Sequence, residues 1–446
     1  MADATPRARQ PPSWAEIQQD LAGKVLSLLP THADRVRFAA VCPQWRAAAR
    51  QLRLPRPLPV LALPDGTVYS LPDGKPLHFP GLDLAGFKTA CGSWLVFRRD
   101  DGCFLVDPFT GTKVTLPALS CVRLIPPDAV ARYIRRGIIS MFHPYATWMH
   151  IIEPNKTPAI NKLIMCSPNL VAAIIGSTMA RPAKTSQILV CRPVASSWSV
   201  LANDPCLMFE HMALYQGKLY AIARDENLRV VNISEDPSTG DPQVSQIQQV
   251  IKGDPFSTGI DSVVKKKIYL VESCGTLLMV RRKVFCRQED VGLVAGQSVF
   301  EVFKADLEQS QWVNVTTIGD DQMLFLGRPC SRAVSTSQYG MSGDQIFFLD
   351  DVMENAFEGY TFQEENTSVS AYDMRTGQVS SPQPMAWDRK MIPPACSRNS
   401  STTIAIDASI LRHGHIILPR RRPDYVSCAT SVSSCKECCL LVLDVK

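Results

Sequence analysis

The stretch "GSWLVFRRDDGCFLVDPFTGTKVTLP", residues 92–117, alternates short apolar segments with turn signals. Asp101-Gly102 is a dipeptide typical of tight turns between antiparallel strands, and Thr110-Gly111 marks a further turn. Residues that favour strands, such as valine, phenylalanine and tryptophan, fill the segments between the turns. The stretch therefore predicts a run of short antiparallel β-strands.

Parts of this pattern return along the chain. The segment "SVSAYDMRTGQVSSP", residues 368–382, repeats its second half, because an Asp, a Thr and a Gly recur with the same spacing. These residues are Asp107, Thr110 and Gly111 in the first copy, and Asp373, Thr376 and Gly377 in the second. The first half returns in three segments, which begin at Gly217, Lys266 and Gly343.

Hairpins that repeat at intervals of several tens of residues are typical of a solenoid or a propeller. In a propeller each sheet is buried on both faces by its neighbours, which accounts for the scattered apolar runs of this chain. Residues 60–446, at about 40 to 60 residues per blade, predict six or seven degenerate blades. We therefore expect a mainly β fold, with an array of two-sheet sandwiches as the alternative architecture.

The N-terminal residues 14–52 have a helical period instead. Ser13 and Glu16 have capping-box spacing, and Pro30 should end the first helix. The apolar stripe of that helix consists of Ile17, Leu21, Val25 and Leu28. Pro43 suits the first turn of a third helix. Three helices this short rarely bury enough surface to be stable alone, so we interpret them as a docking module. The alternative is a helical extension packed on the following domain.

The charge distribution separates this module from the rest of the chain. Residues 1–56 contain nine basic and four acidic side chains, which account for the whole formal net charge of +5. An acidic partner is therefore expected at the N-terminal segment, and a general nucleic-acid surface is not expected on the remainder. The proline-rich stretch "LPRPLP", within residues 53–59, predicts a semi-rigid spacer.

The helical segment resembles an F-box. The resemblance rests on Asp20-Leu21, Val25, "LLP" at Leu28 to Pro30, "DRVRFAAVC" at Asp34 to Cys42 and "QWR" at Gln44 to Arg46. It implies binding to a Skp-type adaptor of cullin–RING ubiquitin ligases. The residues that this assigns to the adaptor surface are Ile17, Gln18, Leu21, Val25, Leu28, Pro30, Val41, Cys42 and Trp45. The family usually has Leu-Pro where this chain has Ile17-Gln18, a departure that should weaken adaptor binding.

The remainder resembles the KIB-type domain of plant F-box proteins, from about Phe87 to Pro382. The matching stretches include "FEHMALYQGKLYAIARDENLRVVNI", "IYLVESCGTLLMVRR" and "VFEVFKADLEQSQWVNV". In that family the propeller-like domain is understood as the half that recruits the substrate. The expected organisation is a flexible tail at 1–13, an F-box at 14–52, a spacer at 53–59 and a KIB-type propeller at 60–446.

Composition and motifs exclude several other classes. No secretory signal begins the chain, and the longest apolar run, Leu170 to Ile175, is too short to span a bilayer. We expect an intracellular protein, cytoplasmic or nuclear, whose fifteen cysteines are mostly reduced and buried. The runs Lys265 to Lys267 and Arg420 to Arg422 are interpreted as solvated loops.

Sites for chemistry are weakly indicated. Cys435 and Cys438 have the spacing of a zinc knuckle, with His413, His415, Cys428 and Cys439 nearby, but no second Cys-x-x-Cys accompanies them. No phosphate loop, dinucleotide fingerprint or nucleophile elbow is present. We therefore expect no metal, no cofactor and no catalytic activity.

The leading functional hypothesis is a substrate-recruiting subunit of an SCF-type ligase, which binds the adaptor through its helices and an unidentified target protein through its propeller. Nucleic acid and membrane are not expected as partners. The alternatives are a ligase-independent propeller with a weakened F-box and, less favoured, a propeller enzyme.

Overall fold

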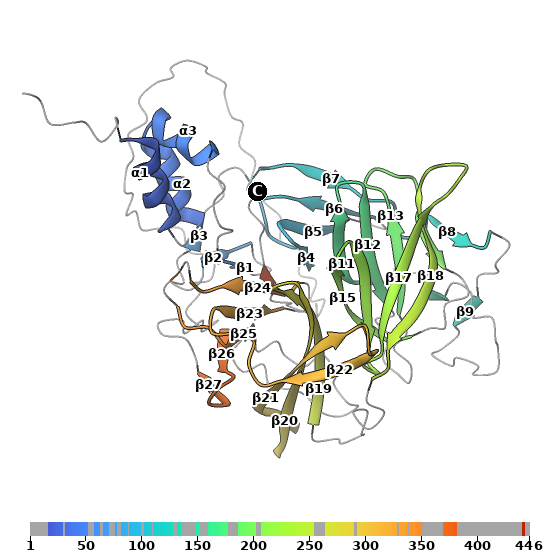
Figure 1. Cartoon of the computed structure of the whole chain (residues 1–446). Coiled ribbons are helices and arrows are strands. Elements are labelled where there is room, and N and C mark those ends of the chain that lie inside the picture. The colour runs from blue at the N-terminus through green and yellow to red at the C-terminus, as the bar shows by residue number, and fades with distance from the viewer. Residues whose placement is uncertain are drawn as a thin grey trace, which may run out of the picture.

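The fold is taken from a computed structural model. It describes residues 17–29, 32–51, 58–62, 66–70, 76–77, 82–87, 89–99, 102–108, 110–127, 132–134, 149–151, 159–176, 186–201, 207–253, 264–289, 292–327, 330–337, 339, 341–349, 369–380 and 439–441. Three helices precede a mainly β region in which strands form a ring of sheets (Figure 1). The helices are α1 (Gln19–Ser27), α2 (His32–Val41) and α3 (Pro43–Gln51).

Five sheets are formed by strands that follow one another in the chain. The first sheet is β4 (Thr89–Cys91), β5 (Trp94–Arg99), β6 (Gly102–Val106) and β7 (Lys113–Thr115). The second is β11 (Ala159–Ser167), β12 (Leu170–Gly176), β13 (Ser186–Cys191) and β14 (Trp198–Leu201), and β8 (Val122–Ile125) pairs with β14 at its edge. The next is β15 (Phe209–Tyr215), β16 (Lys218–Ala223), β17 (Leu228–Glu235) and β18 (Pro242–Ile251). The fourth is β19 (Val264–Ser273), β20 (Thr276–Glu289), β21 (Gly292–Asp306) and β22 (Gln311–Val315). The fifth is β23 (Gln322–Leu326), β24 (Arg332–Ser335), β25 (Gln345–Leu349), β26 (Val369–Asp373) and β27 (Gln378–Ser380).

A further sheet joins the start of the β region to the C-terminal end of the described chain. It contains β1 (Val60–Ala62), β2 (Val68–Ser70), β3 (Pro76–Leu77) and the C-terminal β28 (Cys439–Leu441), which pairs with β1. A small parallel pair, β9 (Arg132–Ile134) and β10 (Met149–Ile151), lies outside these sheets. The strands at the inner edges meet around the ring: β28 contacts β4, β4 contacts β11, β11 contacts β15, β15 contacts β19, β19 contacts β24, and β25 contacts β28.

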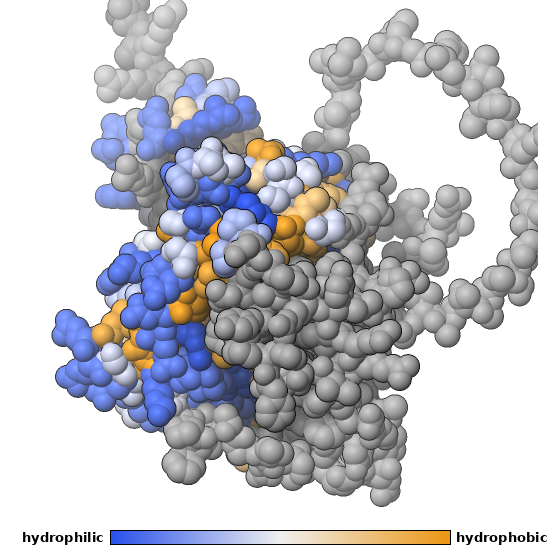
Figure 2. All heavy atoms as spheres, turned by 90° about the vertical axis from the view of Figure 1, so that its right-hand side faces the viewer, coloured by the Kyte–Doolittle hydropathy of each residue, from blue (hydrophilic) through white to orange (hydrophobic). Residues whose placement is uncertain are grey.

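The apolar clusters lie between neighbouring sheets. One contains residues of β12 and β13 together with residues of β15 to β18, and the next combines β15 to β18 with β19 and β20. Another joins β19 to β21 with β23, β25 and β26. This packing buries both faces of a sheet against different neighbours, as a propeller requires. Hydrophilic residues cover most of the described surface in the view of Figure 2, with hydrophobic patches between them.

The predicted mainly β propeller with three N-terminal helices is confirmed, and the sandwich alternative is wrong. The predicted six or seven blades exceed the five formed by consecutive strands. Length divided by blade size could not reveal this, because the sheet of β1, β2, β3 and β28 is assembled from both ends of the described chain. The residues Lys265 to Lys267 are also not a loop, because they belong to β19.

The predicted Asp-Thr-Gly turn connects the last two strands of its sheets. Gly111 donates its backbone N–H to the carbonyl of Asp107 at 2.8 Å, and Gly377 donates to Asp373 at 2.8 Å, both with φ of 69°. A third copy of the turn, not predicted from the sequence, lies at Asp236 to Gly240, where the same hydrogen bond is 2.7 Å long. In the predicted Asp101-Gly102 turn, Gly102 is a strand residue paired with Arg99, and Asp101 lies outside the described residues.

Candidate functional site

The three helices have a small apolar core of their own. Ala22 and Leu26 of α1 contact Phe38 of α2 and Ala48 of α3, and all four are buried. Partly buried Ile17, Leu29, Trp45 and Ala49 surround them. The apolar contacts of this cluster are all within the helical segment, which supports its description as a module.

The outer face of the same helices exposes large apolar side chains. Leu21, Val25 and Leu28 of α1 are 49%, 38% and 75% exposed. Val36 and Val41 of α2 are 51% and 60% exposed. Half of the large apolar side chains exposed in the described part of the chain therefore lie on this short segment, and we name these five residues the apolar helix surface. Such a concentration is typical of a protein-binding surface.

The predicted stripe thus divides in two. Leu21, Val25 and Leu28 point to solvent, whereas Ile17 lies before α1 and is half-buried against the module core. The residues that face the core are instead Ala22 and Leu26 of α1, with Leu29 just after the helix. The helical spacing of the apolar residues correctly indicated an amphipathic helix. The apolar residues outside the predicted stripe, however, form its inner face. Pro30 lies outside the described residues.

Cys42 directly precedes α3, and Trp45 lies in its first turn. The Cys42 thiol accepts a hydrogen bond from the Trp45 backbone N–H at 3.4 Å, and its carbonyl accepts one from Arg46. The Trp45 ring is half-buried, with its centroid 4.3 Å from that of Phe38. Trp45 therefore packs on the module core, whereas Cys42 accepts hydrogen bonds from the first turn of α3. Phe38, the largest buried side chain of this core, was not among the predicted site residues, although its aromatic character on a helix was the signal to use.

Gln18 is the N-cap residue of α1. Its φ of −61° and ψ of 143° are extended, and its side chain makes no capping hydrogen bond. Proline imposes a φ of about −65°. The backbone at Gln18 therefore has the conformation that the usual family proline would fix, although proline is absent.

Two titratable groups meet in the interior of the ring. The Lys162 amine on β11 lies 2.6 Å from Nε2 of His211 on β15, and both side chains are buried. Leu270 donates its backbone N–H to Nδ1 of His211 at 3.2 Å. Burial lowers the pKa of Lys162 to about 7, against the opposing effect of Cys330 and Cys91. Burial, then Lys162, lowers the pKa of His211 well below its usual value. A perturbed pair of this kind can mark an active site, but burial separates it from solvent-borne substrates.

Other predicted chemistry finds little support among the described residues. They contain no group of three or more His, Cys, Asp and Glu side chains placed to hold a metal ion. Most of the C-terminal Cys and His residues lie outside the described residues, and Cys439 is placed only as part of β28. No helix in the described ranges is long and apolar enough to cross a membrane.

These features define a β-propeller protein with an N-terminal helical module that exposes an apolar surface. Residues 63–373 match the KIB1-4 beta-propeller family, and the chain belongs to that family.

Similar proteins of Arabidopsis thaliana carry the name F-box protein. F-box protein At2g26160 is 22% identical over 77% of this chain and 97% of its own length. Putative F-box protein At2g04810 is 22% identical over 83% of this chain and 90% of its own, and Putative F-box protein At3g25750 is 25% identical over 75% and 87%. The resemblance to plant F-box proteins with a KIB-type propeller is confirmed.

Proposed function

We propose that this protein is the substrate-recruiting F-box subunit of an SCF-type cullin–RING ubiquitin ligase. In this proposal the three helices bind a Skp-type adaptor, and the propeller binds a target protein in the cytoplasm or nucleus. The protein contributes recognition and no catalytic group, because ubiquitin transfer belongs to the recruited enzymes. The observation that carries the proposal is the apolar helix surface, on a chain whose relatives are F-box proteins.

The apolar helix surface has the properties of an adaptor site. Its five side chains are exposed on a module whose own core is already filled, so a partner can cover them without unfolding the helices. The same three helices also carry exposed basic side chains, including Lys24, Arg37 and Arg46. A partner with an apolar groove and an acidic rim fits this combination.

The alternative of a weakened F-box rests on Ile17-Gln18. The extended backbone at Gln18 already has the φ that proline would impose, which supports a competent module. We therefore expect the double change Ile17→Leu with Gln18→Pro to raise adaptor affinity by less than about threefold. A much larger gain in adaptor affinity would favour the alternative of a ligase-independent propeller protein with a weakened F-box.

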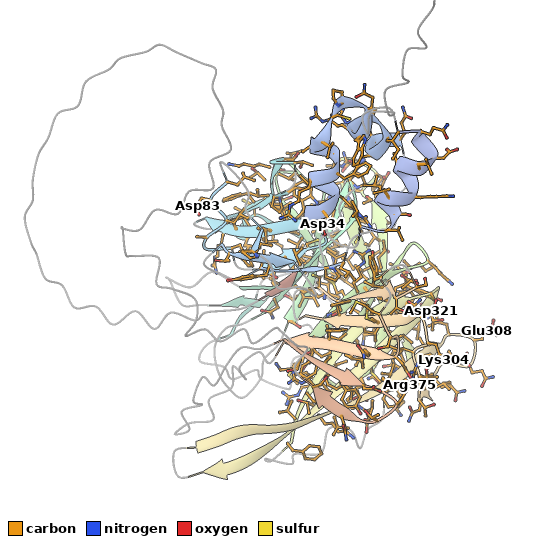
Figure 3. All side chains as sticks on the ribbon, turned by 90° about the vertical axis from the view of Figure 1, so that its left-hand side faces the viewer. Asp34, Asp83, Lys304, Glu308, Asp321 and Arg375 are labelled. Atoms are coloured by element: carbon orange, nitrogen blue, oxygen red, sulfur yellow. The ribbon has the colours of Figure 1, made fainter. Side chains whose placement is uncertain are left out.

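Target binding is assigned to the propeller end that lies away from the helices. The end of β20 and the start of β21, residues 285–289 and 292–296, pair with each other as a two-stranded ribbon. β22 pairs only with the other end of β21, residues 302–306. The ribbon and the tight turn after Asp306 lie at opposite ends of β21. Figure 3 shows the helices, where Asp34 is labelled, far from this ribbon. A target at the ribbon end would leave the adaptor site open.

The test is adaptor binding by the full chain, with Leu28→Ala as the diagnostic variant. Truncating an apolar anchor typically costs about 2 kcal/mol, so we expect binding to weaken about 30-fold. The melting temperature should not change, because Leu28 is 75% exposed. Val194→Ala, at an 83% exposed position of the propeller, is the matched control and should bind normally. A chain that binds no Skp-type adaptor, or a Leu28→Ala variant that binds as wild type, contradicts the proposal.

A further inference from the structure

Arg35 of α2 connects the helical module to the propeller. Its side chain is 8% exposed, although arginine is rarely buried. The guanidinium Nε donates a hydrogen bond to the carbonyl of Leu29, at the end of α1, at 3.0 Å. The same guanidinium is hydrogen-bonded to the hydroxyl of Tyr339, which lies between β24 and β25. One side chain therefore joins two helices of the module to the fifth consecutive sheet of the ring.

The Tyr339 side of this contact is part of the propeller core. Tyr339 packs against a cluster that includes Met323, Phe325 and Phe347. Its backbone N–H donates to the carbonyl of Thr336 at 2.8 Å, which fixes the turn that carries it. Burial raises the pKa of Tyr339 and lowers the pKa of Arg35, as expected for a contact removed from water.

A second attachment point lies in the same cluster. Leu58 follows α3 in the chain, at the end of the segment predicted as a spacer, and is 2% exposed within the apolar cluster against which Tyr339 packs. The adjacent Pro59 is also buried. The module is thus held near Tyr339 both by the chain itself and by Arg35. Two neighbouring attachments restrict rotation, whereas one flexible linker would not.

We propose that Arg35 is a positioning residue: its contact with Tyr339 fixes the helical module in one orientation on the propeller. The contact leaves the apolar helix surface exposed, so it is compatible with adaptor binding. In a ligase, a fixed module would hold the target at a constant distance from the adaptor, and this consequence rests on the proposed function. The orientation itself can be tested without any partner.

The experiment compares Arg35→Gln, Tyr339→Phe and the double variant in the full chain. Tyr339→Phe keeps the ring that packs on the propeller and removes only the hydroxyl. Arg37→Gln is the matched control, because Arg37 is on the same helix but exposed and paired with Asp34 at 2.9 Å. Small-angle scattering reports the spread of module positions, and amide hydrogen exchange reports the protection of α2 and of residues 332–337.

We expect both single variants to broaden the scattering distance distribution and to speed exchange at both sites about tenfold, with no change in Arg37→Gln. The double variant should add little to either single change, because both remove the same contact. The inference would be overturned if the variants scattered and exchanged as wild type does. It would also be overturned if the effect of the double variant were the sum of the two single effects. Adaptor affinity should be the same in wild type, Arg35→Gln, Tyr339→Phe and the double variant. If wild type binds no adaptor, the proposed function fails while the scattering and exchange results still decide the role of Arg35.

Discussion

At the scale of single residues, the buried Lys162 amine is the least expected group of the propeller. The groups close to it are His211 on β15 and the thiols of Cys91 and Cys330. Burial raises the pKa of the Cys91 thiol to about 12, so that thiol is neutral near pH 7. A lysine in this environment is stable as a neutral amine, and protonating it places a charge in a medium that solvates it poorly.

This predicts a pH-dependent stability that Lys162→Met should remove. The pKa of Lys162 is about 7 in the folded protein and 10.5 for an unperturbed lysine, so the unfolded chain binds more protons between these values. Wild-type stability should therefore rise with pH from 7 towards 10.5 and carry the full penalty at pH 7 and below. We expect Lys162→Met to be more stable than wild type by about 2 kcal/mol or more at pH 7, and by less at pH 9.5.

Chemical denaturation of both proteins at pH 7, 8 and 9.5 measures this difference. Other ionisable groups are common to both chains, so their contributions cancel in the comparison. A stability difference that stays constant with pH, or a variant less stable at pH 7, would show that Lys162 is charged and favourably solvated in the folded protein.

The sequence could not reveal this pair. Lys162 and His211 lie on different strands, and each follows another polar residue, Asn161 or Glu210, in a largely apolar strand, so neither stands out in the sequence. Only the ring brings β11 against β15. The apolar stripe of α1 failed for a related reason: a helical period identifies the faces, but the partner elements decide which face is buried. Leu26 turned inward and Leu28 outward because Phe38 and Ala48 are on one side.

At the scale of elements, neighbouring sheets are joined by a buried ionic network around Glu226. This residue lies between β16 and β17 and is 0% exposed. Its carboxylate accepts hydrogen bonds from Lys266 of β19 at 3.0 Å and from Nε of Arg281 of β20 at 2.8 Å. Arg281 and Lys283 also pair with Glu301 of β21 at 2.7 and 2.6 Å. The network therefore fixes the β15–β18 sheet against the β19–β22 sheet.

We predict that Glu226→Gln destabilises the folded protein by about 3 kcal/mol, because it removes the negative charge that two largely buried cations share. The matched control is Asp320→Asn. Asp320 forms an ion pair with Arg375, and the Asp320 side chain is 92% exposed. That pair is solvated, so its loss should cost less than about 1 kcal/mol. Urea denaturation of the three proteins measures both effects, and equal losses in the two variants would contradict the role given to Glu226.

The repeated turns allow a prediction with two opposite signs. Gly377 has φ of 69°, and the added Cβ of an alanine would meet only the Tyr372 hydroxyl at 3.7 Å. The cost of Gly377→Ala is therefore conformational and about 1 kcal/mol. Ser310 holds the equivalent place after Asp306 with φ of 54°. Ser310→Gly should relieve strain and stabilise by about 0.5 kcal/mol. The melting temperature should fall in Gly377→Ala and rise in Ser310→Gly, and shifts of the same sign would refute this account.

Element prediction succeeded where local chemistry determines the structure. The Asp-Thr-Gly turns and the start of α3 at Pro43 follow from residues within one turn of the chain. It failed for Lys266, because a lysine run is typical of a solvated loop unless a buried carboxylate such as Glu226 lies opposite. That carboxylate is 40 residues away in the chain and on another sheet.

At the scale of the whole molecule, the ring depends on a three-residue strand. β28 pairs with β1 through Val60↔Leu441, Leu61↔Leu440 and Ala62↔Cys439. It also contacts β4 on one side and β25 on the other. The strand thus lies where the first and last sheets meet, and it closes the ring between parts of the chain that are distant in sequence. No periodicity in "KECCLLVLDVK", residues 436–446, announces such a role.

We predict that a chain ending at Lys436 loses much of its stability, whereas a chain ending at Leu441 retains it. The shorter chain lacks β28, so β1 loses its antiparallel partner and the ends of β4 and β25 lose an apolar neighbour. Exposing the edge of β1 should also promote association between molecules. Thermal unfolding and light scattering of the two truncated chains measure both effects. We expect the chain ending at Lys436 to melt several degrees lower than the chain ending at Leu441, since about 1 kcal/mol shifts a large domain by a few degrees. Equal melting temperatures and equal scattering would mean that the ring is closed by contacts between sheets, and that β28 only covers the edge of β1.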